Sequence, residues 1–131
     1  MTEFFMPMMP PKITAQEKDI TFNKKGKPVV YDTYELAEAR EKLSAHLAQH
    51  IPETRYNGAV RLCTKWLFPI KGKHKNGEYK TSRPDTDNLQ KMLKDCMTKL
   101  GFWKDDALVC SEITEKFFSD TPGIYIRIDE L

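Results

Sequence analysis

The chain has 131 residues, of which 21 are Lys or Arg, 19 are Asp or Glu and 40% are hydrophobic. This length and apolar fraction suit one packed domain over residues 1–131 and exclude a wholly disordered chain. The sequence contains no run of about 18 apolar residues, which excludes a membrane-spanning helix, and its start lacks the basic and apolar segments of a secretory signal. We therefore expect a cytoplasmic protein that does not enter a membrane.

Short extended pieces are predicted before the first helix. Residues 3–9 are typical of a strand that Pro7 restricts to the edge of a sheet, because proline cannot donate to a ladder. Residues 24–27 (Lys-Lys-Gly-Lys) predict a turn, and residues 28–31 predict a second short extended piece.

The first helix is predicted to begin at Asp32, because Glu35 stands three residues later in the spacing of a capping box. An apolar stripe follows at spacings of three or four, formed by Leu36, Ala39, Leu43 and Leu47. Glu38 and Lys42 can pair across one turn on the outer side of this helix. Pro52 ends the helical stretch.

A strand predicted over residues 59–68 leads into a polar loop over residues 70–82, which contains five cationic or potentially cationic side chains. Residues 53–84 hold eight basic residues against two acidic ones, whereas residues 105–131 hold seven acidic against two basic. This asymmetry suggests a polyanion bound near a carboxylate site, although charge alone also fits two ordinary solvated faces.

The second helix is the clearest predicted element. Its apolar residues fall on one amphipathic face, formed by Leu89, Met92, Leu93, Cys96, Met97 and Leu100. Asp87 and Gln90 have capping-box spacing at its start, and Pro84 helps to stop it from extending backwards. Gly101 stands where a left-handed residue is expected after its end.

Two further strands are predicted over residues 109–118 and 124–128, on either side of a turn at residues 121–123. Strands paired in hairpins and separated by two helices predict an α+β domain. In such a domain the two main helices pack on one face of a mixed β-sheet.

Neither the cysteines nor the histidines show the spacing of a known metal site. The cysteines are odd in number and widely spaced, so we interpret them as small buried thiols: Cys63, Cys96 and Cys110. His46 and His50 stand one helical turn apart, but no glutamate follows the zinc-protease pattern. We expect both to be solvated helix positions.

Two pairs of acids flank the second helix, Asp85 and Asp87 before it and Asp105 and Asp106 after it. An aspartate at a helix start is often only a cap, which would explain Asp87 but not the others. A helix over residues 88–100 is about 20 Å long at ~1.5 Å per residue. The pairs therefore meet only through a favourable fold or across a dimer, and spacing leaves both routes open.

Clustered carboxylates suit Mg²⁺, a hard cation that prefers oxygen ligands and retains waters. Two such ions about 4 Å apart can clamp the attacking and leaving oxygens of a phosphodiester. Lys91, one turn after Asp87, can stabilise charge on a phosphate in the transition state. Its alternative role is a salt bridge to Asp87, worth only a few tenths of a kcal/mol.

Two sequence blocks together resemble the RusA family of Holliday junction resolvases. Residues 83–91 (Arg-Pro-Asp-Thr-Asp-Asn-Leu-Gln-Lys) match a D-x-D-N-x-x-K segment at a helix start. Residues 101–109 (Gly-Phe-Trp-Lys-Asp-Asp-Ala-Leu-Val) match a W-x-D-D-x-x-V segment. The resemblance is strong over residues 83–112 and looser elsewhere. Residues 10–18 differ from the family in being only partly basic, where other members usually carry arginines.

The resemblance implies a RusA-like α+β fold and a homodimeric, Mg²⁺-dependent endonuclease, often encoded by prophages. Such an enzyme cuts four-way junction DNA symmetrically in DNA recombination and repair. By matching positions, Asp85, Asp87 and Asp106 would be the metal-binding catalytic carboxylates, with Asp105 adjacent, and Lys91 would be the catalytic lysine. The nucleic-acid-binding side chains would be the basic residues of the loop, Lys71, Lys73, Lys75, Lys80 and Arg83, which would contact phosphates.

A two-fold symmetric dimer suits this substrate, because a four-way junction can present two equivalent strands to two equivalent sites. Two other functions remain open from the sequence. One is a non-catalytic DNA-binding or regulatory module that keeps the same fold. The other is a nuclease that acts on flaps, other branched nucleic acids or RNA.

Overall fold

The structure is a computed structural model that describes residues 1–12, 18–22, 25–26 and 28–131. Its elements, in chain order, are β1 (Thr2–Met6), β2 (Lys18–Phe22), β3 (Pro28–Asp32), α1 (Tyr34–Leu47), η1 (Ala48–His50), β4 (Val60–Pro69), α2 (Thr86–Leu100), η2 (Asp106–Leu108), β5 (Val109–Ser119) and β6 (Gly123–Glu130). Here η marks a short 3₁₀ helix.

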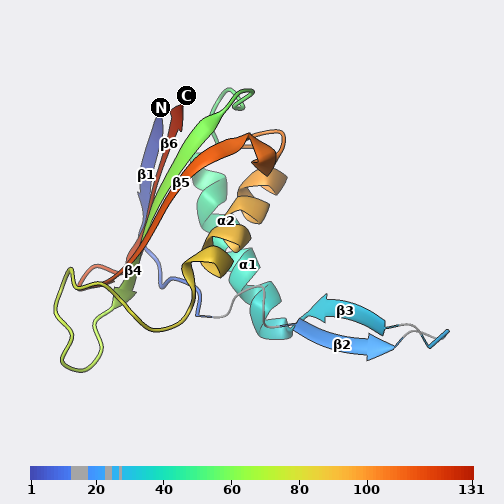
Figure 1. Cartoon of the computed structure of the whole chain (residues 1–131), viewed down its shortest axis with the longest axis horizontal. Coiled ribbons are helices and arrows are strands. Elements are labelled where there is room, and N and C mark those ends of the chain that lie inside the picture. Colours follow the sequence, from blue (N-terminus) through green and yellow to red (C-terminus); the bar gives the residue numbers. More distant parts are fainter. Residues whose placement is uncertain (13–17, 23–24, 27) are drawn as a thin grey trace.

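Four of these strands form a mixed sheet in the order β1-β6-β4-β5, and α1 and α2 lie together on one face of it (Figure 1). β4 is antiparallel to β6 and parallel to β5. Along β4 the side chains alternate, so Leu62 and Trp66 are buried towards the helices while Lys65 is exposed on the other face. The α+β class with two helices on a mixed sheet is therefore confirmed.

Strand pairing differs from the hairpins that the sequence suggested. β5 and β6 are consecutive, yet β4 lies between them in the sheet. The reason is that α2 carries the chain from β4 back to a parallel neighbour, β5, so β6 finds its antiparallel place on the opposite side of β4. β2, which was not predicted, pairs with β3 in a separate two-stranded sheet that extends outward next to the start of α1 (Figure 1).

The edge position of β1 is confirmed, and the strand ends at Met6, directly before Pro7. Of the predicted turn at residues 24–27, Lys24 and Lys27 lie outside the described residues. Within it, Gly26 has a positive φ of 74°, as a turn glycine often does.

α1 begins one residue later than the capping-box spacing predicted. Thr33 is the N-cap, and its hydroxyl oxygen accepts a hydrogen bond from the Leu36 backbone N–H at 3.2 Å. Asp32 is instead the last residue of β3, so its backbone belongs to the ladder. The predicted apolar stripe is largely buried, and the pairing of Glu38 with Lys42 is confirmed at 3.9 Å.

α2 also begins earlier than predicted. The Leu89 N–H donates to the Asp85 carbonyl at 3.1 Å, so the first helical bond closes with Asp85 at the N-cap position and not Asp87. Its apolar face is buried at five positions, Leu89, Met92, Leu93, Cys96 and Met97. At its end Gly101 adopts the predicted left-handed conformation, with φ of 89°.

Only one of the cysteines is buried as predicted. Cys96 lies on the packed side of α2, whereas Cys63 faces away from the helices and Cys110 is exposed at the start of an edge strand. Partial burial raises the pKa of the Cys63 thiol. His46 and His50 are half-buried rather than solvated, because His50 stacks on Phe4 with ring centroids 4.2 Å apart.

The two helices and the sheet enclose an aromatic and aliphatic core in which Trp66 and Trp103 are fully buried. A polar chain crosses it: the Trp66 indole N–H donates to the Thr64 hydroxyl at 3.0 Å, and that hydroxyl donates to Gln90 at 2.9 Å. These bonds tie α2 to β4 just where the predicted site begins. In the described part of the chain, no helix combines the length and the apolar character needed to span a membrane.

Candidate active site and basic pocket

The start of α2 presents two carboxylates to solvent. Asp85 is exposed at the N-cap position and makes no capping hydrogen bond, and Asp87 is exposed in the first turn. Pro84, just before them, is buried, and Leu89, just after them, packs into the core. The two aspartates therefore stand on an anchored segment, at the helix end where the macrodipole favours negative charge.

β5, the strand after α2, brings Lys116 back to the start of this helix. It does not bring back the second aspartate pair, Asp105 and Asp106. Lys94, in the middle of α2, forms an ion pair with Glu112, near the beginning of β5. Lys116 lies four residues after Glu112 on β5. Its Nζ donates to the carbonyls of Ser82 and Pro84, both at 2.8 Å. β5 thus runs back along α2, and its later residues reach the start of the helix.

Asp106 consequently lies at the other end of α2. It begins η2, which follows the C-terminal end of the helix (Figure 1). Because α2 has 15 residues, it separates Asp106 from Asp85 and Asp87 by about 20 Å at ~1.5 Å per residue. Within one chain, the described residues include no group of three Asp, Glu, His or Cys side chains able to hold a metal ion.

The remaining predicted site residues occupy distinct places. Asp105 has a structural role, since its carboxylate accepts a hydrogen bond from the Ala107 N–H at 2.9 Å and caps η2. Lys91 is exposed on α2, one turn after Asp87. The ion pairs among the described residues do not join Lys91 to Asp87, so the salt bridge suggested by their spacing is absent there.

A cation-lined pocket of about 530 Å³ opens beside the start of α2, between the ends of β4 and β5 and the long loop. Its basic lining residues are Lys12, Lys71, Lys80 and Arg83, and its apolar lining includes Phe68 and Phe118. The Lys80 ammonium lies 5.3 Å and 5.0 Å from the centroids of these two rings. The lining contains no acidic residue.

Electrostatics in this basic pocket favour an anion. Burial lowers the pKa of Lys80, and the nearby charges of Lys116, Lys71 and Lys12 lower it further. The ion pairs formed among the described residues give none of these lysines a carboxylate partner. A phosphate in the pocket would relieve that mutual repulsion, because opposite charge stabilises the protonated amines.

Sequence reasoning identified part of this surface. Lys71, Lys80 and Arg83 line the pocket, whereas Lys73 and Lys75 are exposed elsewhere on the loop. It missed Lys12 and Lys116. Lys116 had one available signal, because it is one of only two basic residues in the acidic segment 105–131. Lys12 offered none, since only the tertiary fold brings residues 8–12 to this side.

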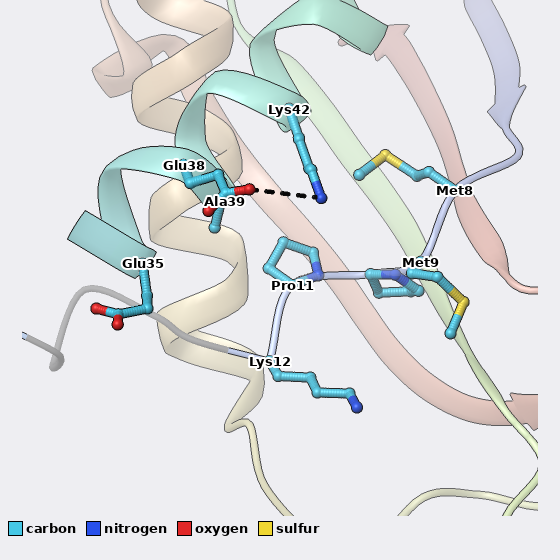
Figure 2. Close-up of a pocket in the computed structure, with 9 residues that line it drawn as sticks. Met8, Met9, Pro11, Lys12, Glu35, Glu38, Ala39 and Lys42 are labelled. Carbon is cyan, nitrogen blue, oxygen red and sulfur yellow. Dashed lines mark ion pairs between the residues drawn. The ribbon is translucent and has the colours of Figure 1, made fainter. Parts of the chain in front are cut away.

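A second hollow, of about 410 Å³, lies between residues 8–12 and α1 (Figure 2). It is lined by Lys12 and Lys42 but also by Glu35 and Glu38, and the Glu38–Lys42 ion pair lies along its α1 wall. Its charges balance, so it lacks the excess of cations that suits the basic pocket to a polyanion.

These features define a class of protein: a small α+β chain that presents paired aspartates beside a cationic pocket, an arrangement suited to metal-assisted cleavage of a nucleic-acid phosphodiester. The family model described as endodeoxyribonuclease RusA matches residues 9–129. The chain belongs to this family and is thereby an endodeoxyribonuclease, a class of nuclease that generally depends on a metal ion.

Two relatives are similar to this chain in sequence. The crossover junction endodeoxyribonuclease rusA of Lactococcus phage r1t is 34% identical over 131 aligned residues, which cover 98% of this chain and 96% of that protein. The uncharacterized protein YqaN of Bacillus subtilis (strain 168) is 32% identical over 95 residues, which cover 64% of this chain and 66% of that protein.

Proposed function

We propose that the chain, acting as one domain over residues 1–131, is a Mg²⁺-dependent endonuclease that resolves four-way DNA junctions in recombination and repair. The observation that carries the proposal is the pair of exposed carboxylates, Asp85 and Asp87, beside a pocket whose lysines have no acidic partner among the described residues. Its family and the name of the phage relative support DNA junctions as the substrate.

The donor set at the start of α2 fits Mg²⁺. This ion is usually held by one or two carboxylates, several waters and oxygens of the substrate phosphate, and Asp85 and Asp87 offer two exposed carboxylates on an anchored helix start. Asp106 would supply a third oxygen donor from a second copy of the chain, because within one chain the length of α2 separates it from Asp85 and Asp87. When bound, Mg²⁺ would polarise the scissile phosphate and promote ionisation of the attacking water.

The other side chains would bind and orient the DNA. Lys71, Lys80 and Arg83 in the basic pocket, with Lys73 and Lys75 on the loop, would contact backbone phosphates without reading sequence. Lys91, exposed on the same helix as Asp87, would offset the negative charge that develops on the phosphate. We further propose a homodimer, whose two equivalent sites would cut the junction symmetrically.

Replacing one carboxylate tests the catalytic role of this site. In Asp87→Asn we expect junction binding to persist and cleavage in Mg²⁺ to be lost, because an amide oxygen carries no charge for a hard cation. The measurement is a denaturing gel of labelled junction DNA after incubation with protein and Mg²⁺, beside a binding assay in Ca²⁺. Glu41→Gln, at an exposed position on α1, is the matched control and should cut normally.

Cleavage by Asp87→Asn at the wild-type rate would remove this residue from the mechanism. The alternative is a non-catalytic DNA-binding module of the same fold, and the separation of Asp106 from Asp85 and Asp87 within one chain favours it. Wild-type protein that binds junctions but never cuts them would support that module. A panel of flaps, other branched DNA and RNA on the same gel distinguishes a junction enzyme from a broader nuclease.

A further inference from the structure

Lys116 on β5 is a half-buried lysine that no carboxylate among the described residues neutralises. Its register partner on β4 is the fully buried Trp66, so its side chain lies on the sheet face that the helices cover. Lys94 offers a contrast, because it pairs with Glu112 and so links α2 to β5 by an ordinary ion pair. A half-buried charge without an acidic partner must be stabilised in another way.

The Lys116 ammonium is bonded to backbone instead. Its Nζ donates to the carbonyls of Ser82 and Pro84, both at 2.8 Å. The Lys116 carbonyl in turn accepts from the Lys80 N–H at 3.0 Å. One residue therefore holds both ends of the segment 80–84, which connects the long loop to α2. Hydrogen bonds from an ammonium are charge-assisted, so they are stronger than bonds between neutral groups.

The segment held in this way ends directly before Asp85. The Asp85 side chain makes no capping hydrogen bond, so capping does not fix its carboxylate. Its backbone is held on both sides: the Asp85 carbonyl accepts from the Leu89 N–H at 3.1 Å, and Lys116 binds the preceding carbonyl, that of Pro84. The position of this carboxylate consequently depends on a side chain from the neighbouring strand.

We propose that Lys116 is a positioning residue for the metal site, because it fixes the backbone that carries Asp85. This inference rests on the proposed function, in which Asp85 is a ligand of Mg²⁺. That ion demands nearly ideal octahedral geometry, so it binds weakly to a ligand that moves. Residues that orient metal ligands without touching the metal change metal affinity or activity by about 10- to 100-fold when they are replaced.

A different role for Lys116 would be to attract DNA by its charge alone. Its charge is close enough to Lys80 to lower the pKa of that lysine, yet Lys116 is not among the residues that line the basic pocket. Two of its three N–H groups are occupied by carbonyls. We therefore expect its replacement to alter the use of Mg²⁺ more than the binding of DNA.

Amide exchange tests whether Lys116 holds this segment, without reference to activity. In Lys116→Met, which keeps an apolar stem but has no donor, exchange of the Leu89 N–H should be about tenfold faster, because its acceptor on Asp85 is less firmly held. Exchange of the Gly101 N–H, at the other end of α2, should stay unchanged and so show that the effect is local. NMR of isotope-labelled protein measures both rates.

The Mg²⁺ dependence of junction cleavage tests the effect on the site. For Lys116→Met, the Mg²⁺ concentration that gives half-maximal cleavage should rise about 10- to 100-fold, and the rate at saturating Mg²⁺ should recover. Lys116→Arg should behave like the wild type, because a guanidinium keeps the charge and can donate to both carbonyls. The salt slope of junction binding in Ca²⁺ should stay unchanged, whereas loss of a phosphate contact would make it shallower by about one.

Lys94→Met is the matched control, since Lys94 also links α2 to β5 but does so from the middle of the helix. It should leave the Mg²⁺ dependence and the Leu89 exchange rate unchanged, even if it lowers the urea midpoint. Equal shifts of the Mg²⁺ dependence in Lys94→Met and Lys116→Met would overturn the inference, because general loosening of the fold would explain both. If circular dichroism shows that Lys116→Met does not fold, Lys116→Gln, which keeps a polar end, is measured in the same way.

The outcomes keep this inference apart from the proposed function. Faster Leu89 exchange with an unchanged Mg²⁺ dependence would overturn the role of Lys116 in the metal site, while the proposed endonuclease stands. A shallower salt slope with an unchanged Mg²⁺ dependence would assign Lys116 to DNA contact instead. Wild-type protein that never cuts would contradict the proposed function. An unchanged Leu89 exchange rate in Lys116→Met would overturn the inference whether or not the wild type cuts.

Discussion

At the scale of single residues, Lys80 is the clearest case of crowded positive charge in the basic pocket. Its ammonium lies over two aromatic rings and close to Lys116, Lys71 and Lys12, and burial together with these charges lowers its pKa. The folded chain therefore holds this proton less tightly than the unfolded chain does. Unfolding takes up a proton between the lowered pKa and the ordinary value of 10.5, so this group makes stability rise with pH in that range.

Lys80→Gln should weaken DNA binding and leave the fold intact. We expect the slope of log affinity against log salt to become shallower by about one, since one phosphate contact is lost. The unfolding free energy should also lose part of its rise with pH below 10.5. Fluorescence binding titrations at several salt concentrations, and urea unfolding at several pH values, measure the two effects.

Lys42→Gln is the control for this substitution, because Lys42 is exposed on α1 and pairs with the surface carboxylate of Glu38 at 3.9 Å. It should change neither the salt slope nor the pH dependence. Equal losses of affinity in the two variants would mean that net charge alone, and not the basic pocket, determines binding.

At the scale of elements, the end of α2 determines where η2 and β5 begin. Gly101 stops the helix in a left-handed conformation, and its N–H donates to the Met97 carbonyl at 3.1 Å. The next residues, Phe102 and Trp103, are fully buried, which anchors the segment that leads to Asp105 and Asp106. The turn after α2 therefore positions one of the proposed catalytic residues.

Gly101→Ala should destabilise the protein by about 1 kcal/mol, because an L-residue at positive φ pays a steric cost within its own backbone. A Cβ at this position would meet no other atom within 4 Å, so packing adds nothing to that cost. Urea unfolding measures the change. Gly58→Ala is the matched control, with equal space but no positive φ, and should be neutral or slightly stabilising. Equal effects at both glycines would contradict this argument.

At the scale of the whole molecule, charge is segregated although the formal net charge is only +2. The cations gather around the pocket beside the start of α2, while residues 105–131 are acidic. Such an arrangement would bind a polyanion through one side of the molecule, with release of counterions from the DNA.

Binding of four-way junction DNA should therefore weaken steeply as salt rises. Each phosphate contact contributes about −0.9 to the slope of log affinity against log salt, so four or more contacts give a slope steeper than about −3. Equilibrium titrations of Asp87→Asn, which should bind without cutting, measure it. An affinity that hardly changes between low and physiological salt would exclude the basic pocket as the principal contact.

The sequence by itself determined the local features of this protein. Helix periodicity identified α1 and α2, Gly101 marked the end of α2, and the strands β4, β5 and β6 followed from alternation and turn residues. The chemically suggestive residues were also visible, because Asp85, Asp87, Lys91 and Asp106 stand in two recognisable blocks. All of these signals depend on residues that are close to one another in the sequence.

The tertiary structure alone decided which of these elements and residues lie next to one another. The helices begin one or two residues away from the predicted starts, because the first backbone hydrogen bonds run from Ala37 to Thr33 and from Leu89 to Asp85. Non-local pairing put β4 between β5 and β6, brought Lys12 and Lys116 to the basic pocket, and left Asp106 a helix length from Asp85. Sequence spacing cannot encode such contacts, since they arise only when strands distant in sequence pair and enclose a common core.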